Sequence, residues 1–353
     1  MIYTVTLNPT IDRTMHFPGL TLGTLNRAVS SRMDFSGKGV NVSMGLHQFG
    51  LESVIMGIMA GASGRIFEQS LKSAGYSCDC LHLEGETRSN ITVVDDATGV
   101  TTKLNEPGPT VTEEDLATFE QRLLSRVREG DLCVFSGSLP PGAPSDTYAH
   151  LIGAVHSQGA KAALDTSGEA LKLGCAAGPE LLKPNEDEAV GLLSRPLESD
   201  EELASGLGAL LALGPQRVLL SLGGRGAALA DGDSIQTSFD PPQSKRGSKL
   251  VCWLAKPPAI TEVSAVGAGD ALMAAGLWAW IQGLSAQETV RWAVAAGTAA
   301  AMGDGSAMPE MVHIQDAYGK TRVTCLSKDR VDTSTNHANL REQRKRISAD
   351  SRN

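Results

Sequence analysis

Short apolar runs alternate with helix-like segments along most of this chain, and the alternation limits the folds open to it. Runs that end in Asn, Gly, Ser or Asp predict buried strands that lead into loops. These strands are expected at residues 2–7, 54–59, 132–135, 162–164, 181–183 and 217–222. Helices are expected at residues 40–48, 113–128, 145–158, 200–213, 270–281 and 286–302. The pattern predicts an α/β fold with a mainly parallel sheet between helices, which binds ligands at the carboxyl ends of its strands.

Two segments break the alternation. Residues 14–35 and 87–104 are rich in Thr, Val, Arg and Asp with a period of two, and the second contains the turn sequence of residues 95–99. This pattern predicts strands of a small separate β element. Two interpretations stay open on the pattern alone, a lid over a cleft and a simple extension of the sheet edge.

Composition and charge exclude several classes of protein. Hydrophobic residues make up 41% of the 353 residues, which is enough for a large core and excludes wholesale disorder. The net charge of −9 argues against general affinity for nucleic acid or acidic membranes. We find no signal peptide in residues 1–12 and no apolar run approaching 18 residues.

The six cysteines are scattered and form no C-x-x-C pair, so we expect a reducing, cytoplasmic setting. Cys78 and Cys80 are the one close pair. A metal site there is the less favoured alternative to two small residues on a strand or loop.

The end of the chain has a different composition. Residues 326–353 are polar, basic residues outnumber acidic ones, and apolar periodicity stops at Val331. We expect a mobile tail after a folded domain of residues 1–325, with a tail that binds nucleic acid or a partner as the alternative. Residues 241–250 are expected to be an inserted loop.

Residues 266–270 (Val-Gly-Ala-Gly-Asp) lead directly into an expected helix, which begins at Asp270. Small residues let successive backbone N–H groups converge at a helix N-terminus, which suits a phosphoryl group that gains charge during transfer. Asp270 in the first turn is then a candidate base for a hydroxyl proton. Plain capping of the helix is the alternative for this residue.

A second glycine-rich stretch, Gly37-Lys38-Gly39-Val40-Asn41, precedes another expected helix. Its spacing is not that of a P-loop, and no G-x-G-x-x-G follows the first strand, which removes the main support for a nicotinamide-binding fold. Flexible glycines around Lys38, with Asn41 one turn later, suit a polar phosphate-bearing ligand. An ordinary loop is the alternative.

Three further polar segments follow predicted strands and so are expected at one sheet edge. Residues 136–142 (Ser-Gly-Ser-Leu-Pro-Pro-Gly) form a rigid turn with exposed hydroxyls, and residues 221–227 form a glycine-rich loop. Between them, Lys183-Pro184-Asn185 is followed by Glu188, a spacing that could organise magnesium through water. Each segment is weak alone, and their shared edge is the stronger argument.

In this order the segments resemble the PfkB (ribokinase-like) family of carbohydrate kinases, and the likeness covers about residues 1–310. The matching stretches are residues 7–12, 37–42, 136–142, 183–185 with Glu188, 221–227 and 267–270. The opening Asn8-Pro9-x-x-Asp12 and the stretch Thr87-Arg88-x-Asn90 are most similar to the hexose-phosphate branch. That branch holds 1-phosphofructokinases, tagatose-6-phosphate kinases and the minor 6-phosphofructokinases.

The resemblance implies a ribokinase-like three-layer α/β/α sandwich with a small β lid, which favours the lid interpretation of residues 14–35 and 87–104. It implies a homodimer formed through that lid. It also implies ATP-dependent phosphorylation of a sugar phosphate, with 1-phosphofructokinase as the expected activity and tagatose-6-phosphate or 6-phosphofructokinase as the alternative.

The resemblance also implies roles for individual residues. Asp270 would take the hydroxyl proton, while the amides of Gly267, Ala268 and Gly269 would stabilise the transferring group. Substrate would be bound by Asp12, Gly37, Lys38, Asn41, Arg88, Asn90 and Ser138, with Arg88 on the phosphate because its guanidinium suits bidentate contacts. ATP would be bound by Lys183, Asn185, Glu188, Ser221, Gly223 and Gly226. Glu188 would hold Mg²⁺ through water.

Two other classes of function remain as alternatives. A sugar-phosphate sensor that binds without transfer would have no reason to keep Asp270, Asn185 and Glu188 together. A dehydrogenase lacks its glycine fingerprint after residues 2–7. Protection against unfolding by ATP rather than NAD would separate a kinase from a dehydrogenase.

Overall fold

The computed structural model describes residues 1–232, 250–303 and 308–326. Its main sheet has eleven strands, and β1 (Ile2–Thr6) lies between β4 (Val54–Ala60) and β9 (Leu132–Ser136), parallel to both. The other parallel strands are β5 (Ser77–Cys78), β6 (Leu81–Leu83), β10 (Lys161–Asp165), β11 (Leu181–Leu182) and β12 (Arg217–Ser221). The far edge is antiparallel and consists of β13 (Ala227–Asp231), β14 (Cys252–Lys256) and β15 (Arg322–Cys325).

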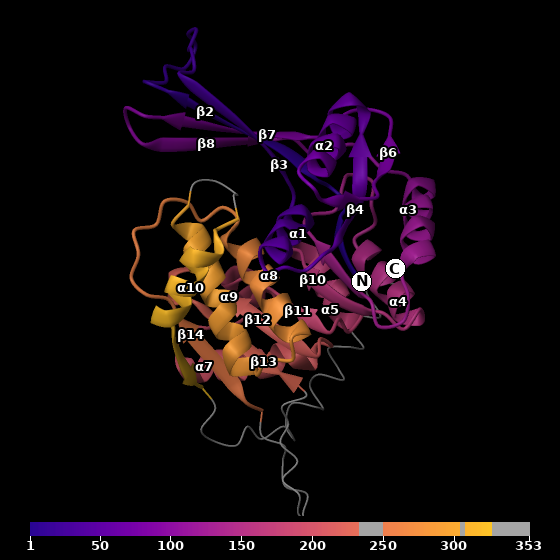
Figure 1. The fold of residues 1–353 in the computed structure, drawn as a ribbon, viewed down its shortest axis with the longest axis vertical. Helices are drawn as coiled ribbons and strands as arrows, with labels where there is room; N and C mark the ends of the chain where they lie inside the picture. Colours follow the sequence, from indigo (N-terminus) through magenta and orange to yellow (C-terminus); the bar gives the residue numbers. More distant parts are fainter. Residues whose placement is uncertain (233–249, 304–307, 327–353) are drawn as a thin grey trace, which may run out of the picture.

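Helices cover both faces of this sheet, which makes the body a three-layer α/β/α sandwich (Figure 1). One face carries α3 (Glu113–Arg126), α4 (Thr147–Ser157), α5 (Gly168–Ala176), α6 (Glu186–Leu193) and α7 (Asp200–Ala212). The other face carries α1 (Lys38–Gln48), α8 (Ala268–Ile281) and α9 (Ala286–Ala301), with α2 (Gly61–Ser73) and α10 (Met311–Lys320) beside them. Both cores are apolar because strands buried on two faces carry side chains into each.

The β–α order and the mainly parallel sheet are confirmed, and each expected strand and helix has a counterpart within a few residues of the prediction. Four helices were not predicted, α2, α5, α6 and α10, nor were strands β5, β6, β13, β14 and β15. The expected inserted loop and the expected C-terminal tail lie outside the described residues, apart from Leu250 and Leu326.

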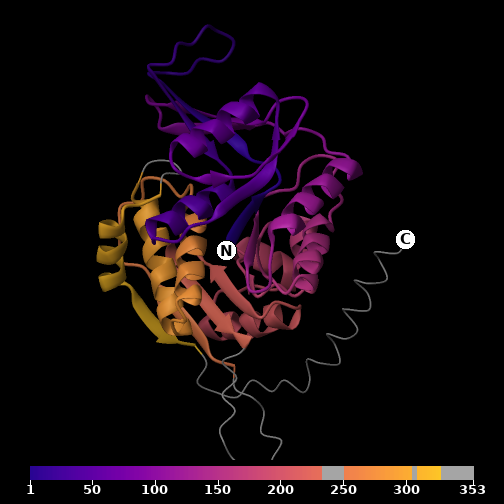
Figure 2. The same cartoon turned by 45° about the vertical axis from the view of Figure 1, so that its right-hand side comes forward.

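A second sheet of four strands is separate from the main sheet, so the residues expected to form a small β element do not extend its edge. It consists of β2 (Thr10–Phe17), β3 (Ser30–Ser36), β7 (Ser89–Asp95) and β8 (Val100–Asn105), in the order β3-β2-β7-β8. Two antiparallel hairpins from distant parts of the chain meet through the parallel pair β2–β7. We call this sheet, with residues 18–29 between β2 and β3, the arm. It projects from the body in both ribbon views (Figures 1 and 2).

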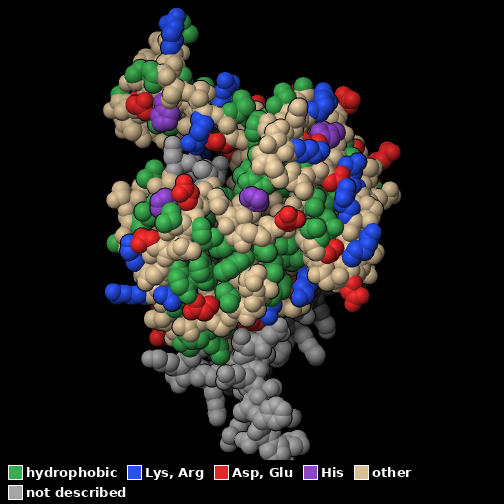
Figure 3. Space-filling model, in the orientation of Figure 1, with side chains coloured by type: hydrophobic (Ala, Val, Ile, Leu, Met, Phe, Trp, Pro, Cys, Tyr) green, Lys and Arg blue, Asp and Glu red, His purple; other side chains and the backbone are tan. Residues whose placement is uncertain are grey.

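The arm has an exposed apolar surface, in contrast to the buried cores of the body. All six residues of its edge strand β8 are exposed. The large exposed hydrophobic residues of the arm are Leu22, Leu25, Val29, Met33, Val100 and Leu104. In the space-filling view the arm stands clear of the body, with hydrophobic side chains along it (Figure 3).

An aromatic cluster joins the helices on the side of the sheet that carries α8. Trp278 stacks on Phe49 with ring centroids 4.8 Å apart, and its edge meets Trp292, which in turn stacks on Tyr318. The four residues come from α8, the end of α1, α9 and α10, so their packing fixes these helices to one another. No helix of residues 1–232, 250–303 and 308–326 is long and apolar enough to cross a membrane.

Candidate active site

The carboxyl ends of five neighbouring parallel strands bring the predicted polar segments to one edge of the sheet. In spatial order the strands are β1, β9, β10, β11 and β12. The residues that follow them are Leu7–Asn8, Gly137–Ser138, Thr166–Ser167, Lys183–Asn185 and Leu222–Gly223. Such an edge is where open α/β sheets bind ligands, so topology alone assembles most of the site.

Asp270 lies in the first turn of α8 and is only 7% exposed. Asn41 of α1 donates a hydrogen bond of 2.8 Å from Nδ2 to Oδ2 of this carboxylate. Burial, and then the negative charge of Asp165, raise the pKa of Asp270 to about 6, despite opposing contributions from Asn41 and two lysines. A carboxylate with a pKa near the working pH is suited to general base catalysis.

The N-terminus of α8 points its backbone at the same region. Gly267 is the N-cap residue and adopts a left-handed conformation with φ of 80°, which glycine reaches without strain. No side chain caps this helix end. The N–H of Ala268 donates a turn hydrogen bond of 3.3 Å to Ala265, and the N–H of Asp270 donates one of 3.1 Å to Gly267. The helix end therefore combines a glycine turn with the positive end of the helix dipole.

Asp165 was not predicted as a site residue, yet it connects two residues that were. It ends β10, is fully buried, and accepts from Nζ of Lys38 at 2.9 Å on one oxygen. Nζ of Lys183 lies 3.1 Å from its other oxygen. A Cβ on Gly269 would come within 3.7 Å of Nζ of Lys183, so this ammonium group lies beside the first turn of α8. The sequence signal was a carboxylate directly after a buried strand.

The glycine-rich loop before α1 packs closely on β1. Gly37 is the N-cap residue with φ of 152°, and its carbonyl accepts from the N–H of Asn41 at 2.8 Å. A Cβ on Gly39 would lie 2.5 Å from Oγ1 of Thr6, so only glycine permits this approach. The close packing sets where Lys38 and Asn41 emerge.

Asp12, Arg88 and Asn90 come together on the arm. β2 and β7 pair with Asp12 opposite Asn90, and Nδ2 of Asn90 donates to Oδ1 of Asp12 at 3.1 Å. Burial raises the pKa of Asp12, although hydrogen bonds and Arg88 oppose it. The carbonyl of Arg88 accepts from the N–H of Ile11, while its buried side-chain Nε has no partner among the described residues.

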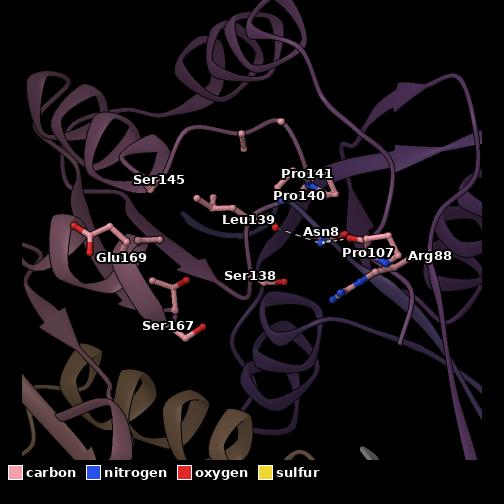
Figure 4. Close-up of a pocket in the computed structure, with 14 residues that line it drawn as sticks. Asn8, Arg88, Pro107, Ser138, Leu139, Pro140, Pro141, Ser145, Ser167 and Glu169 are labelled. Carbon is pink, nitrogen blue, oxygen red and sulfur yellow. Dashed lines mark hydrogen bonds between the residues drawn. The ribbon is translucent and has the colours of Figure 1, made fainter. Parts of the chain in front are cut away.

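A cavity of about 480 Å³ lies between Arg88 and Pro107, which flank the arm strands β7 and β8, and the segments that follow β9 and β10. Arg88 and Ser138 are among its lining residues, and their polar ends point toward one another in Figure 4. Asn8 holds the neighbouring walls together, since its Nδ2 donates to the carbonyls of Pro107 and Leu139. Ser167 also lines the cavity, so hydroxyls and a guanidinium surround a space that suits a phosphate group.

On the other side of the site, Asn185 and Glu188 form a capping box at α6. The side chain of Asn185 accepts from the N–H of Glu188, and Glu188 accepts from the N–H of Asn185, each at 2.8 Å. Ser221 at the end of β12 lies beside them, with its N–H donating to Pro184 at 3.0 Å. Asn185 and Glu188, which are predicted nucleotide-binding residues, therefore also fix the start of α6.

The glycine-rich loop after β12 packs closely against β14. Gly223 and Gly226 have φ of 55° and 97°, and a Cβ on Gly226 would lie 2.0 Å from the carbonyl oxygen of Ala255. Arg225 fastens the loop to residues 197 and 198 by donating to both carbonyls.

The residues present fit ATP and magnesium. The helix N-terminus at Gly267 and the ammonium group of Lys183 suit phosphate oxygens. No cluster of three or more His, Cys, Asp or Glu side chains able to hold a metal occurs among the described residues. Glu188 as a single carboxylate suits Mg²⁺ that keeps most of its ligands from water and phosphate.

Comparison with known proteins agrees with this geometry. Residues 5–311 match the family model described as pfkB family carbohydrate kinase. The chain belongs to the pfkB family. Several 1-phosphofructokinases are 31–36% identical to it, and the one from Rhodobacter capsulatus is 36% identical over 83% of this chain and 88% of its own. The tagatose-6-phosphate kinase of Staphylococcus epidermidis is 31% identical over 78% of this chain and 83% of its own.

A solved structure shows the same fold for this pfkB chain. Phosphofructokinase-2 from Escherichia coli, in complex with substrates and products, superposes with a TM-score of 0.80 at 28% identity. The match covers 90% of this chain and 98% of the other. The expected ribokinase-like sandwich and the expected family are thus confirmed.

Proposed function

We propose that this pfkB family chain is a 1-phosphofructokinase, which transfers the γ-phosphoryl group of ATP to fructose 1-phosphate and yields fructose 1,6-bisphosphate and ADP. The observation that carries the proposal is the position of Asp270. Its carboxylate is buried at the N-terminus of α8, is oriented by Asn41, and has a pKa raised to about 6. A base beside a phosphate-binding helix end suits phosphoryl transfer to a hydroxyl.

In the proposed reaction the free primary hydroxyl of the sugar phosphate attacks the γ-phosphorus. A new O–P bond forms, the bond to the bridging oxygen of ADP breaks, and Asp270 accepts the hydroxyl proton. The amides of Gly267, Ala268 and Gly269 would face the negative charge on the transferring group. When bound, Mg²⁺ would neutralise charge on the ATP phosphates, with Glu188 holding it through water.

The proposed sugar site lies on the arm side of the base. Asp12 and Asn41 would hold sugar hydroxyls, with Asn90 bonded to Asp12, and Gly37 and Lys38 would line the same region. Arg88 lines a cavity together with Ser138, and its buried Nε has no hydrogen-bond partner in the part of the chain that the structure describes, which supports a grip on the existing phosphate. Lys183, Asn185, Ser221, Gly223 and Gly226 would lie along ATP.

A coupled assay of ADP release with Mg·ATP tests the substrate. The acceptors are fructose 1-phosphate, fructose 6-phosphate, tagatose 6-phosphate and unphosphorylated fructose. A preference in kcat/KM for fructose 1-phosphate supports the proposal. Preference for a 6-phosphate keeps the proposed mechanism and favours the alternative, a tagatose-6-phosphate or 6-phosphofructokinase activity. The similarity to a tagatose-6-phosphate kinase is the reason for including tagatose 6-phosphate. Binding without turnover on any acceptor would indicate a sensor.

We also propose that two copies associate through the arm. Its edge strand β8 is fully exposed and carries Leu104 at 55% exposure, and an unpaired edge with apolar side chains favours pairing with another chain. Leu104→Glu should then convert a dimer to a monomer in sedimentation velocity. Val312→Glu, at a similarly exposed site on α10, is the matched control. A wild-type monomer, or a Leu104→Glu dimer, would refute the interface.

We assign residues 1–325 to the kinase domain and the protein to the cytoplasm. The six cysteines are scattered along the chain without a C-x-x-C pair, and four of them are buried, which supports a reducing compartment.

A further inference from the structure

Asp165 has no role in the reaction as proposed so far, although it is the most buried charge at the site. Its exposure is 0%, and its backbone is fixed in the sheet, where its carbonyl accepts from the N–H of Gly137 at 2.9 Å. The neighbouring Thr166 donates to the carbonyl of Gly137 at 2.8 Å, which closes the same turn. The carboxylate therefore occupies a rigid position between the ends of β9 and β11.

Two lysines from different elements converge on this carboxylate. Lys38 is the first residue of α1 and Lys183 follows β11, and they lie 2.9 and 3.1 Å from separate oxygens of Asp165. Lys183 is only 4% exposed, so its ammonium group is held out of water by this contact. Burial by itself would raise the pKa of Asp165, but Lys183 and Lys38 lower it below its ordinary value, which keeps the carboxylate ionised.

The same three charges act on the proposed base. Burial and then Asp165 raise the pKa of Asp270, whereas the hydrogen bond from Asn41 and the charges of Lys38 and Lys183 lower it. Charged groups therefore face Asp270 from β10, from α1 and from the segment after β11. The negative charges of Asp270 and Glu188 also act on Lys38, in addition to the contact with Asp165.

We propose that Asp165 is a positioning residue, which holds the ammonium groups of Lys38 and Lys183 toward the transferring phosphoryl group and acts electrostatically on the base Asp270. The inference rests on the proposed function, because it concerns the same transfer step. A carboxylate between two lysines keeps both cations in place before a polyanionic substrate binds. A preorganised arrangement of this kind needs little rearrangement when charge develops.

Two substitutions should move the base in opposite directions. Asp165→Asn removes the negative charge near Asp270 and releases two cations, so the acid limb of kcat/KM should move to lower pH by on the order of one unit. The value of kcat should fall about 100-fold because the lysines lose their fixed geometry. Lys183→Met removes a positive charge, so the limb should move to higher pH. A merely structural role for Asp165 predicts no shift of the limb.

The matched control is Asp131→Asn. Asp131 is also a buried carboxylate, 8% exposed, but it lies before β9 at the opposite edge of the sheet and pairs with the N-terminal amine. This variant should leave the acid limb at the wild-type pH. Asp165→Glu keeps the negative charge but displaces it. Compared with Asp165→Asn, its acid limb should return closer to the wild-type pH than its kcat returns to the wild-type value.

A direct titration separates failure of this inference from failure of the proposed function. Carboxyl ¹³C NMR of aspartate-labelled protein reads the pKa of Asp270 without turnover, with its signal assigned by Asp270→Asn. Inactive wild-type enzyme would overturn the proposed function, while the NMR titration would still test the coupling. An Asp270 titration that is the same in wild type, Asp165→Asn and Lys183→Met would overturn the role of Asp165. If Asp165→Asn does not fold, the upward shift expected in Lys183→Met decides, and its absence refutes the coupling.

Discussion

Nδ2 of Asn41 lies 2.8 Å from Oδ2 of Asp270 and donates to it, so a residue in the first helix of the chain orients a carboxylate 229 positions later. The contact links the loop of Gly37 to the N-terminus of α8. One hydrogen bond thereby joins the proposed sugar side of the site to the proposed phosphate side.

The activity of the wild-type enzyme should depend on pH through this carboxylate. The pKa of Asp270 is about 6, and only its ionised form accepts a proton, so kcat/KM should fall as pH drops below about 6 and level off above it. Initial rates measured from about pH 4.5 to pH 8, in steps of about half a pH unit, determine the position of this limb. A limb near pH 4 would mean that the base has an ordinary pKa.

Asp270→Asn should lower kcat about 1000-fold while sugar-phosphate binding stays nearly intact, because it removes the base and keeps the shape. The same change should stabilise the fold at pH 7. Folding raises the pKa of Asp270 from 3.8 to about 6. At pH values above the unfolded pKa, keeping this carboxylate ionised in the folded state therefore lowers the free energy of unfolding, by at most about 3 kcal/mol. Denaturant unfolding should show this gain at pH 7 and its loss near pH 4. Ordinary turnover in this variant would rule out Asp270 as the base.

Asn41→Ala should move the acid limb to higher pH, because the hydrogen bond from Asn41 lowers the pKa of Asp270. It should also raise KM for the sugar through a lost hydroxyl contact. Ser43→Ala is the control on the same helix, since its buried hydroxyl bonds only to Ser53 at 2.6 Å among the described residues. The two variants giving the same limb would contradict the proposed orientation of the base.

Arg88→Ala should raise KM for fructose 1-phosphate by about 10- to 100-fold, the value of a hydrogen bond to a charged group, with little effect on kcat. Its effect on unphosphorylated fructose should be small. Arg65→Ala removes an exposed arginine of α2 and serves as the control. An unchanged KM in Arg88→Ala would mean that the phosphate is held elsewhere.

Glu188→Gln should raise the Mg²⁺ concentration needed for half-maximal rate, because an amide is a poorer partner for the metal and its water. The capping box at α6 survives, since the amide oxygen still accepts from Asn185. Glu202→Gln changes the equivalent box at α7, where Glu202 accepts from Ser199. If both variants respond alike to Mg²⁺, the residue serves only as a helix cap.

Much of the body could be predicted from the sequence, because buried parallel strands give continuous apolar runs and their ends gather at one edge. The antiparallel edge was missed, since the short Ala-rich run of β13 does not distinguish a strand from a helix. Helices α5 and α6 were missed for a different reason, because nine and eight residues give too few turns for periodicity.

The motifs of the candidate site could be recognised in the sequence, whereas the contacts between residues of different motifs could not. Asp165 stands at a recognisable strand end, but its partner Lys38 is 127 positions away, and no local pattern reports such a contact. The parallel pair of β2 and β7 is equally distant in sequence, and it alone brings Asp12 beside Asn90. Long-range pairing of this kind follows from the packing of the whole chain.

The four tryptophans are unevenly distributed, so tryptophan fluorescence reports on only part of the molecule. Trp253 belongs to β14, Trp278 and Trp280 to α8, and Trp292 to α9, so all of them lie in the body and none in the arm. Intrinsic fluorescence will therefore follow melting of the helices around the proposed base and will be blind to an arm that detaches first. A tryptophan introduced at Phe17, which is buried at the end of β2, would make that event visible.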